Sequence, residues 1–88
     1  MGKEVRFQNR DRFIELGLEI SALRKMRGMS QEELATKAKI SRSHLSSIEA
    51  PNIVRPFSLE VLYNIADALN VQAGDLLYGY FFKDEKED

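Results

Sequence analysis

Polar residues between positions 42 and 49 could form hydrogen bonds with the base edges of DNA. If this segment is a helix, Leu45 and Ile48 point inward, and the direction of every other side chain follows, because successive residues are rotated by about 100°. The residues that then face outward are Ser43, Ser46 and Ser47. Arg42 flanks this strip, and its guanidinium could donate two hydrogen bonds to O6 and N7 of a guanine.

Each of these side chains also has an ordinary structural interpretation. Arg42 could be a solvated arginine in a first helical turn, although a cation there opposes the helix dipole and gains nothing locally. The serines are small enough to let a backbone approach DNA, but an exposed serine-rich face is common. His44, on the other edge of the strip, could contact a phosphate or a base, or be a plain surface histidine. The base-reading hypothesis therefore depends chiefly on Arg42.

A repeated pattern predicts where the helices that position this segment begin. An apolar residue precedes a serine, and a leucine follows four residues later, at Met29-Ser30-Leu34, Ile40-Ser41-Leu45 and Phe57-Ser58-Leu62. The serine can accept hydrogen bonds from free backbone N–H groups, while the apolar residue packs on the leucine as a hydrophobic staple. Ser30 and Glu33 also match a capping box. Helices are predicted over 31–38, 42–49 and 59–69.

Two further helices complete a predicted all-α fold of five helices. Apolar residues recur at spacings of three and four in the first segment, at Phe13, Leu16, Ile20 and Leu23. This spacing predicts an amphipathic helix over 11–27 that ends at Gly28. A short helix is expected over 73–78, after Asn70 ends the one before it. The two prolines predict a loop over 50–57.

The helices over 31–38 and 42–49 are joined by only three residues, 39–41. Two short helices with so short a connection cannot lie flat against each other, and the angled pair that results is a helix-turn-helix. The residues expected inside the corner are small or apolar: Ala35, Ile40, Leu45 and Ile48. Residues 31–49 are therefore the predicted DNA-binding unit.

Composition excludes several classes of protein. The chain has 88 residues, 43% of them apolar, which suits one domain. It contains no cysteine and a single histidine, so we expect no disulfide, no thiol nucleophile, no metal and no cofactor. Without a phosphate-binding loop or paired histidines, an enzyme is not expected. The absence of a long apolar run and the charged segment 1–12 predict a cytoplasmic protein without a membrane span.

Charge is distributed unevenly along the chain, although the net charge is −1. Up to Arg55 there are eleven Lys and Arg against seven Asp and Glu, whereas from Pro56 onward there are two against seven. A basic segment beside an acidic tail is typical of proteins that bind a polyanion, although solubility alone can produce the same asymmetry.

The motifs together resemble the Cro and phage-repressor type of helix-turn-helix, the XRE family. The motifs that carry the resemblance are Leu23-Arg24, Gly28-Met29-Ser30-Gln31-Glu32-Glu33-Leu34-Ala35, Ile40-Ser41-Arg42-Ser43, Leu45, Ile48-Glu49, Ser58-Leu59-Glu60 and Ala66-x-x-Leu69-x-Val71. The match covers about 13–77. It implies a compact, lambda-repressor-like domain of five helices, usually dimeric, with the helix over 42–49 in the major groove.

The resemblance also implies roles for single residues. It places Arg42, Ser43 and Ser47 at positions that touch base edges. The residues that it places near DNA phosphates are Gln31, Asn52, Arg55 and Ser58, with Lys37 and Lys39 close enough to add charge. Gln31 could instead be an ordinary first-turn residue, and the lysines could be solvated. It further implies a structural ion pair between Arg24 and Glu49.

The sequence departs from the family pattern in two places. The turn position before Ile40 is commonly glycine, which favours a left-handed backbone, but here it is Lys39. The loop after Glu49 usually opens with a polar residue and glycine, whereas this chain has Ala50-Pro51-Asn52-Ile53-Val54. The loop from which phosphate contacts are expected therefore differs from the family pattern at its start.

The C-terminal segment 76–82 is more apolar than a frayed chain end. Part of it could complete the core, or it could be an exposed interface. We expect a two-fold homodimer through this segment, with contacts from Leu77, Tyr78, Tyr80, Phe81 and Phe82. The expected organisation is an N-terminal extension over 1–10, a DNA-binding domain over 11–78 and an apolar and acidic tail over 79–88.

Two functions remain in competition at this point. The first is a sequence-specific regulator of transcription, a repressor or activator that binds a palindromic operator in double-stranded DNA as a homodimer. The alternative is a protein-interaction module, such as an antitoxin or adaptor, in which the tail binds a partner protein and DNA binding is secondary. The near-neutral charge and the acidic tail leave room for the second.

Overall fold

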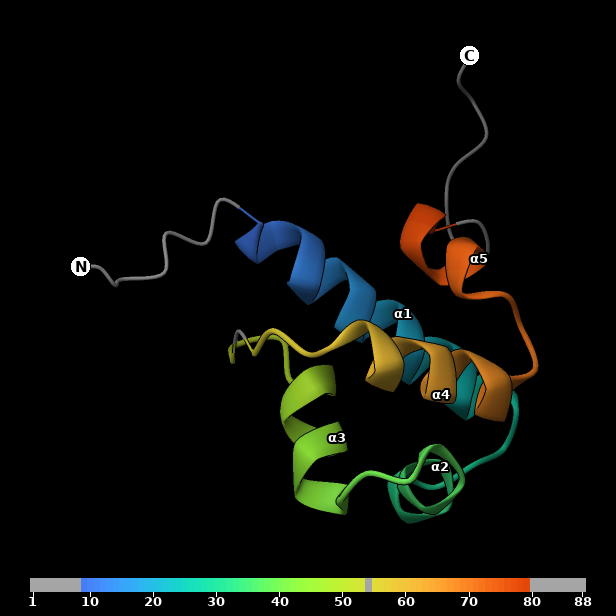
Figure 1. Ribbon diagram of the computed structural model, residues 1–88. Helices are drawn as coiled ribbons and strands as arrows, with labels where there is room; N and C mark the ends of the chain where they lie inside the picture. The colour runs from blue at the N-terminus through green and yellow to red at the C-terminus, as the bar shows by residue number, and fades with distance from the viewer. Residues whose placement is uncertain (1–8, 54, 80–88) are drawn as a thin grey trace.

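The computed structural model describes residues 9–53 and 55–79, and these residues form five α-helices (Figure 1). They are α1 (Arg10–Met26), α2 (Gln31–Ala38), α3 (Arg42–Glu49), α4 (Leu59–Leu69) and α5 (Ala73–Tyr78). The described residues contain no β-strand. The predicted all-α fold is confirmed, with four helices at the predicted bounds and α1 shifted by one residue toward the N-terminus. The predicted division into extension, domain and tail stays a prediction.

Serine caps begin the three middle helices, as predicted. Ser30, Ser41 and Ser58 have extended backbones, and each Oγ accepts a hydrogen bond from the N–H three residues later, at 3.0, 3.0 and 3.1 Å. At Ser30 the capping box is complete, because its own N–H donates to Glu33 Oε1 at 3.0 Å. Side-chain caps of this kind satisfy N–H groups that no helical carbonyl can reach.

Left-handed residues end α2 and α4. Lys39 and Asn70 both have φ 62°, and each is followed by an apolar residue whose N–H donates back into the helix, to Ala35 and Ala66 respectively. Asparagine tolerates this conformation well, whereas lysine does so at a cost because of its Cβ. Lys39 is therefore a strained residue in the turn between α2 and α3.

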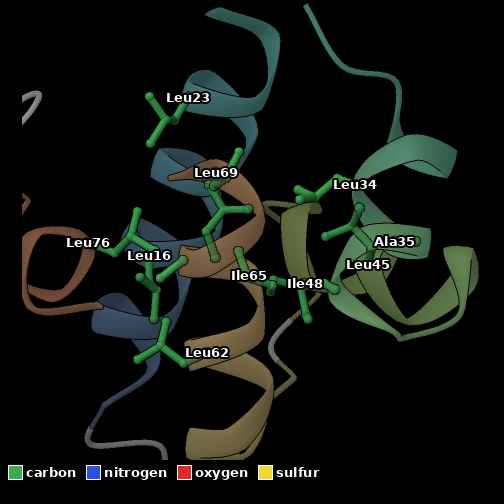
Figure 2. Packing of buried hydrophobic residues seen from close by; sticks show 13 residues of the cluster. Leu16, Leu23, Leu34, Ala35, Leu45, Ile48, Leu62, Ile65, Leu69 and Leu76 are labelled. Atoms are coloured by element: carbon green, nitrogen blue, oxygen red, sulfur yellow. The ribbon is translucent and has the colours of Figure 1, made fainter. Parts of the chain in front are cut away.

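The hydrophobic core lies where α4 meets the other helices. Figure 2 shows Ile65 and Leu69 of α4 between the side chains of α1 and those of α2 and α3. The buried core residues are Leu16, Ile20, Leu23, Leu34, Ala35, Ala38, Leu45, Ile48, Leu62, Ile65, Ala66, Leu69 and Leu76. One continuous core thus supports both helices of the helix-turn-helix, so α3 is part of a rigid scaffold.

Two contacts outside the core attach α1 to the rest of the domain. The Phe13 and Phe57 rings meet edge to face, with centroids 5.7 Å apart, and hold the segment before α4 against α1. Arg27 Nε donates a 2.8 Å hydrogen bond to the Leu69 carbonyl at the end of α4.

Among the described residues, no helix is both long enough and apolar enough to cross a membrane.

Candidate nucleic-acid interface

The outward face of α3 carries the predicted strip of polar residues. Leu45 and Ile48 are buried, with 0% and 5% of their surface exposed, and they anchor α3 to the core. Arg42, Ser43 and Ser46 are exposed. Within the described part of the chain, the Arg42 guanidinium has no hydrogen-bond partner, so its donors are available to a ligand. A rigid helix thus presents an arginine and two hydroxyl groups to solvent.

Ser47 and His44 are less accessible than the rest of the strip. Both are half-buried, and Ser47 Oγ donates a 3.0 Å hydrogen bond to the His44 carbonyl. Because this bond uses the only hydroxyl donor of Ser47, its oxygen can act toward another molecule only as an acceptor. The hydroxyl groups of Ser43 and Ser46 can both donate and accept hydrogen bonds.

A buried ion pair joins α1 to the end of α3. Arg24 Nε donates to Glu49 Oε2 at 2.8 Å, and Arg24 Nη2 donates to Glu49 Oε1 at 2.9 Å. Only 9% of the Arg24 side chain and 4% of the Glu49 side chain are exposed. A third donor, Arg24 Nη1, bonds the Met29 carbonyl at 2.7 Å. The bidentate geometry sets both the distance and the orientation of α3 relative to α1.

Gln31 belongs to the same network, which sequence reasoning missed. Its Nε2 donates a 2.9 Å hydrogen bond to Glu49 Oε1, so this oxygen accepts from two side chains. The Gln31 amide therefore connects the N-terminus of α2 to the C-terminus of α3, across the open end of the helix-turn-helix. Its role as a phosphate ligand stays a prediction, and the donors that remain for that role are the second N–H of its side-chain amide and its backbone N–H.

Gly17 is a second positioning residue that sequence reasoning missed. It is buried in the middle of α1, and a methyl group there would overlap the carbonyl oxygen of Ile48. The absence of a side chain lets α1 approach the backbone of α3 directly. A glycine inside a helix costs stability relative to alanine, so its position on the buried face was a signal that could have been used.

The loop before α4 contributes the remaining predicted phosphate ligands. Asn52 and Arg55 are exposed, while the Ser58 hydroxyl caps α4. Lys37 and Lys39 are also exposed. The structure thus leaves the side chains of the loop and of the lysines accessible.

The predicted dimer contacts fall partly within the structure. Leu77 and Tyr78 of α5 are 62% and 61% exposed. Tyr80, Phe81 and Phe82 lie outside the described residues. No group of three or more His, Asp or Glu side chains in the described ranges is arranged to hold a metal ion.

Comparison with known proteins places these features in a family. Residues 20–76 match a family described as helix-turn-helix, and this region includes both helices of the motif. A search of curated proteins gives no match.

Three solved structures share the fold over most of the chain. The restriction-modification controller protein C.AhdI from Aeromonas hydrophila is 30% identical, with a TM-score of 0.68, and the match covers 73% of this chain and 94% of that one. The master regulator for biofilm formation SinR, in complex with DNA, is 39% identical, with a TM-score of 0.64 and coverage of 70% and 97%. The clp gene regulator ClgR from Corynebacterium glutamicum is 28% identical, with a TM-score of 0.68 and coverage of 76% and 68%.

The fold and its outward helix face define a class of DNA-binding transcriptional regulators. The chain belongs to the helix-turn-helix family of the XRE type, as its motifs predicted. This class and its lambda-repressor-like fold are those of regulators, not of enzymes.

Proposed function

We propose that the protein binds a palindromic operator as a homodimer and inserts α3 of each copy into the major groove. The observation that carries the proposal is the exposed face of α3. Arg42, Ser43 and Ser46 project from a helix whose opposite side is buried in the core. A helix held rigidly in this way presents its hydrogen-bond donors in one arrangement, which is what discrimination between bases requires.

Arg42 is the principal base contact in this proposal. Its guanidinium can donate two parallel hydrogen bonds to guanine O6 and N7, which neither A·T pair offers. It lies in the first turn of α3, and the first turn of the second helix of this motif contacts bases most directly. Ser43, Ser46 and Ser47 add weaker hydrogen bonds, while His44 contacts a phosphate.

Phosphate contacts supply the sequence-independent part of the affinity. The N-terminus of α2 at Gln31 and that of α4 at Ser58 both expose backbone N–H groups, and helix N-termini attract phosphate. Asn52 and Arg55 extend the second of these sites. The similarity to SinR, whose structure is in complex with DNA, supports DNA binding by this chain, since the match covers 70% of this chain at 39% identity.

A two-fold dimer places two copies of α3 on one face of the duplex, at half-sites about one helical turn apart. The exposed Leu77 and Tyr78 side chains support dimerisation through α5. Two half-sites also compensate for a small base-reading strip, because two copies double the number of base contacts. Location in the cytoplasm stays a prediction.

The alternative, an interaction module with secondary DNA binding, is favoured by one observation. An apolar groove opens beside α5, on residues that take no part in the polar strip of α3. If a partner protein were the main ligand, variants of this groove would abolish function while variants of α3 would not.

Selection of duplexes from a random pool tests the proposal. We expect enrichment of a palindromic sequence whose half-sites lie about one helical turn apart, with affinity that falls steeply as salt rises. If no common sequence were enriched, or if the affinity for DNA did not depend on salt, the proposal would be contradicted.

A further inference from the structure

A groove opens between α1, the start of α4 and α5. One wall is formed by α1 residues between positions 9 and 22, and the other by residues 57–59, Leu62 and residues 76–79. Its volume is about 960 Å³. The floor includes the buried side chains of Leu16, Leu62 and Leu76, so the groove lies directly over the core. No residue of α2 or α3 contributes to it.

The rim of the groove concentrates exposed apolar surface. The described residues include seven large apolar side chains that are exposed, and four of them line this one groove: Leu18, Leu59, Leu77 and Tyr78. Isolated apolar residues on a surface need no explanation, whereas a contiguous apolar hollow marks a binding site. The groove therefore needs an apolar occupant.

We propose that the occupant is the aromatic segment Tyr80-Phe81-Phe82 of a second copy of this chain, exchanged reciprocally between the two copies. The inference rests on the proposed homodimer and names where its contacts are made. Each copy offers one groove and one aromatic segment, so reciprocal exchange closes a dimer and leaves no binding site open.

The length of the chain beyond the structure matches the groove. Gly79 is the last described residue and lines the rim, where a Cβ atom on it would come within 2.8 Å of Glu19 Oε2. From Glu19 to Arg12 the α1 wall extends for about 10 Å, at about 1.5 Å per residue. Three extended residues span about the same distance. The proposal requires that, in a two-fold dimer through α5, the tail of the partner enters at this same rim.

The order of residues in the tail also matches the groove. The aromatic residues come first and would cover the apolar floor between Phe13 and Leu76. The six residues that follow, 83–88, carry four acids and two lysines. They would arrive at the first turn of α1, where Arg12 lies at the far end of the groove. In this direction the charged residues would lie past the apolar floor, beside the polar side chains of Asn9 and Arg12.

Cysteine cross-linking tests the exchange, because the natural chain contains no cysteine. Full-length Leu18→Cys chains are mixed with full-length Phe81→Cys chains that carry a mass tag, and the mixture is oxidised mildly. We expect a covalent pair of one tagged and one untagged chain, formed at least tenfold faster than with Met26→Cys in place of Leu18→Cys. Met26 is 68% exposed and lies outside the groove, so it is the matched control.

The double variant Leu18→Cys with Phe81→Cys tests whether each tail occupies the groove of its own chain instead of the groove of the partner. Rapid cross-linking within one chain and none between chains would show that the tail fills its own groove, and would overturn the proposal. Equal rates for Leu18→Cys and Met26→Cys would also overturn it. Thermal unfolding of each variant, followed by circular dichroism, verifies that all are folded.

Light scattering separates failure of this inference from failure of the proposed function. A natural chain that is dimeric at tens of micromolar and binds the selected duplex, but does not cross-link through Leu18, would leave the proposed function intact and refute the exchange. In support of the exchange, Leu18→Lys should weaken dimerisation at least tenfold, whereas Met26→Lys should leave it unchanged.

Discussion

Gly17 of α1 lies against the backbone of Ile48 in α3, so closely that a methyl group on Gly17 would overlap the Ile48 carbonyl oxygen. The next nearest atoms are also backbone atoms, with the Ile48 carbonyl carbon 3.2 Å and the Glu49 Cα 3.6 Å from that methyl position. The helix that carries the polar strip is therefore supported by direct contact with α1 at its C-terminal end, as well as by the side chains of the core.

Replacement of Gly17 by alanine should force α1 and α3 apart. Backbone atoms cannot yield as a flexible side chain can, so we expect a loss of about 1–3 kcal/mol in the free energy of unfolding, as for other overpacked sites. Urea denaturation measures this loss. Affinity for the selected duplex should fall as well, because α3 moves.

Gly74→Ala is the matched control for Gly17→Ala. Gly74 lies in α5, and a Cβ atom on it would meet nothing within 4 Å. We expect this variant to be neutral or to gain about 0.5 kcal/mol, since alanine restricts the unfolded chain. Equal losses at both glycines would contradict the role of the Gly17 contact.

Removal of one partner of the Arg24–Glu49 pair should be costly. Arg24→Ala leaves the buried Glu49 carboxylate without its bidentate partner, and the expected loss is about 3–5 kcal/mol. The variant with both residues replaced should lose less than the sum of the single variants, because neither charge is then left alone. Urea denaturation of the three variants measures the coupling.

The exposed pair of Arg10 and Asp11 provides a control for this measurement. Its atoms are 3.9 Å apart, and the two side chains are 54% and 95% exposed. Arg10→Ala should change the stability by no more than about 1 kcal/mol. A similar change for Arg24→Ala would show that the buried network does not hold α3 in place.

Replacement of each of the two lysines near the end of α2 by glycine should change the free energy of unfolding in opposite directions. Lys39 has a left-handed backbone, with φ 62°, so Lys39→Gly should raise the free energy of unfolding by about 1 kcal/mol. Lys37 lies inside α2, where glycine costs about 1 kcal/mol. Both variants lose one positive charge, so their difference isolates backbone conformation. Destabilisation by both would contradict the strain at Lys39.

Two serines of the helix-turn-helix should differ in their effect on stability. Ser41 caps α3 through a 3.0 Å hydrogen bond, and Ser41→Ala should cost about 1 kcal/mol. Ser46 is exposed and caps nothing, so Ser46→Ala should stay within about 0.5 kcal/mol of the natural chain. Thermal unfolding compares the two variants, and equal losses would contradict the assigned cap.

The ends of the helices could be predicted because their signals are local. Ser30, Ser41 and Ser58 lie next to the N–H groups that they cap, and Asn70 and Lys39 mark ends that the pattern placed correctly. A few neighbouring residues decide these features. The sequence alone therefore predicted α2 to α5 at their observed bounds.

Contacts between distant segments could not be predicted in the same way. Gln31 and Glu49 are 18 residues apart, and nothing near Gln31 indicates that its amide bonds a carboxylate. The groove likewise depends on the contact of α1 with residues 57–59, which the Phe13–Phe57 pair establishes only in the folded chain. The outward face of α3 could be predicted, because two buried positions, Leu45 and Ile48, fix the direction of every other side chain of the helix.

The central claim is that α3 reads base edges chiefly through Arg42. The most direct measurement compares natural and Arg42→Ala proteins on the selected duplex and on a scrambled duplex of equal length, at the same salt concentration. We expect the ratio of the two affinities to fall at least fivefold, which corresponds to about 1 kcal/mol of lost discrimination, while binding to the scrambled duplex changes little. Equal losses on both duplexes would contradict the claim and make Arg42 a phosphate contact.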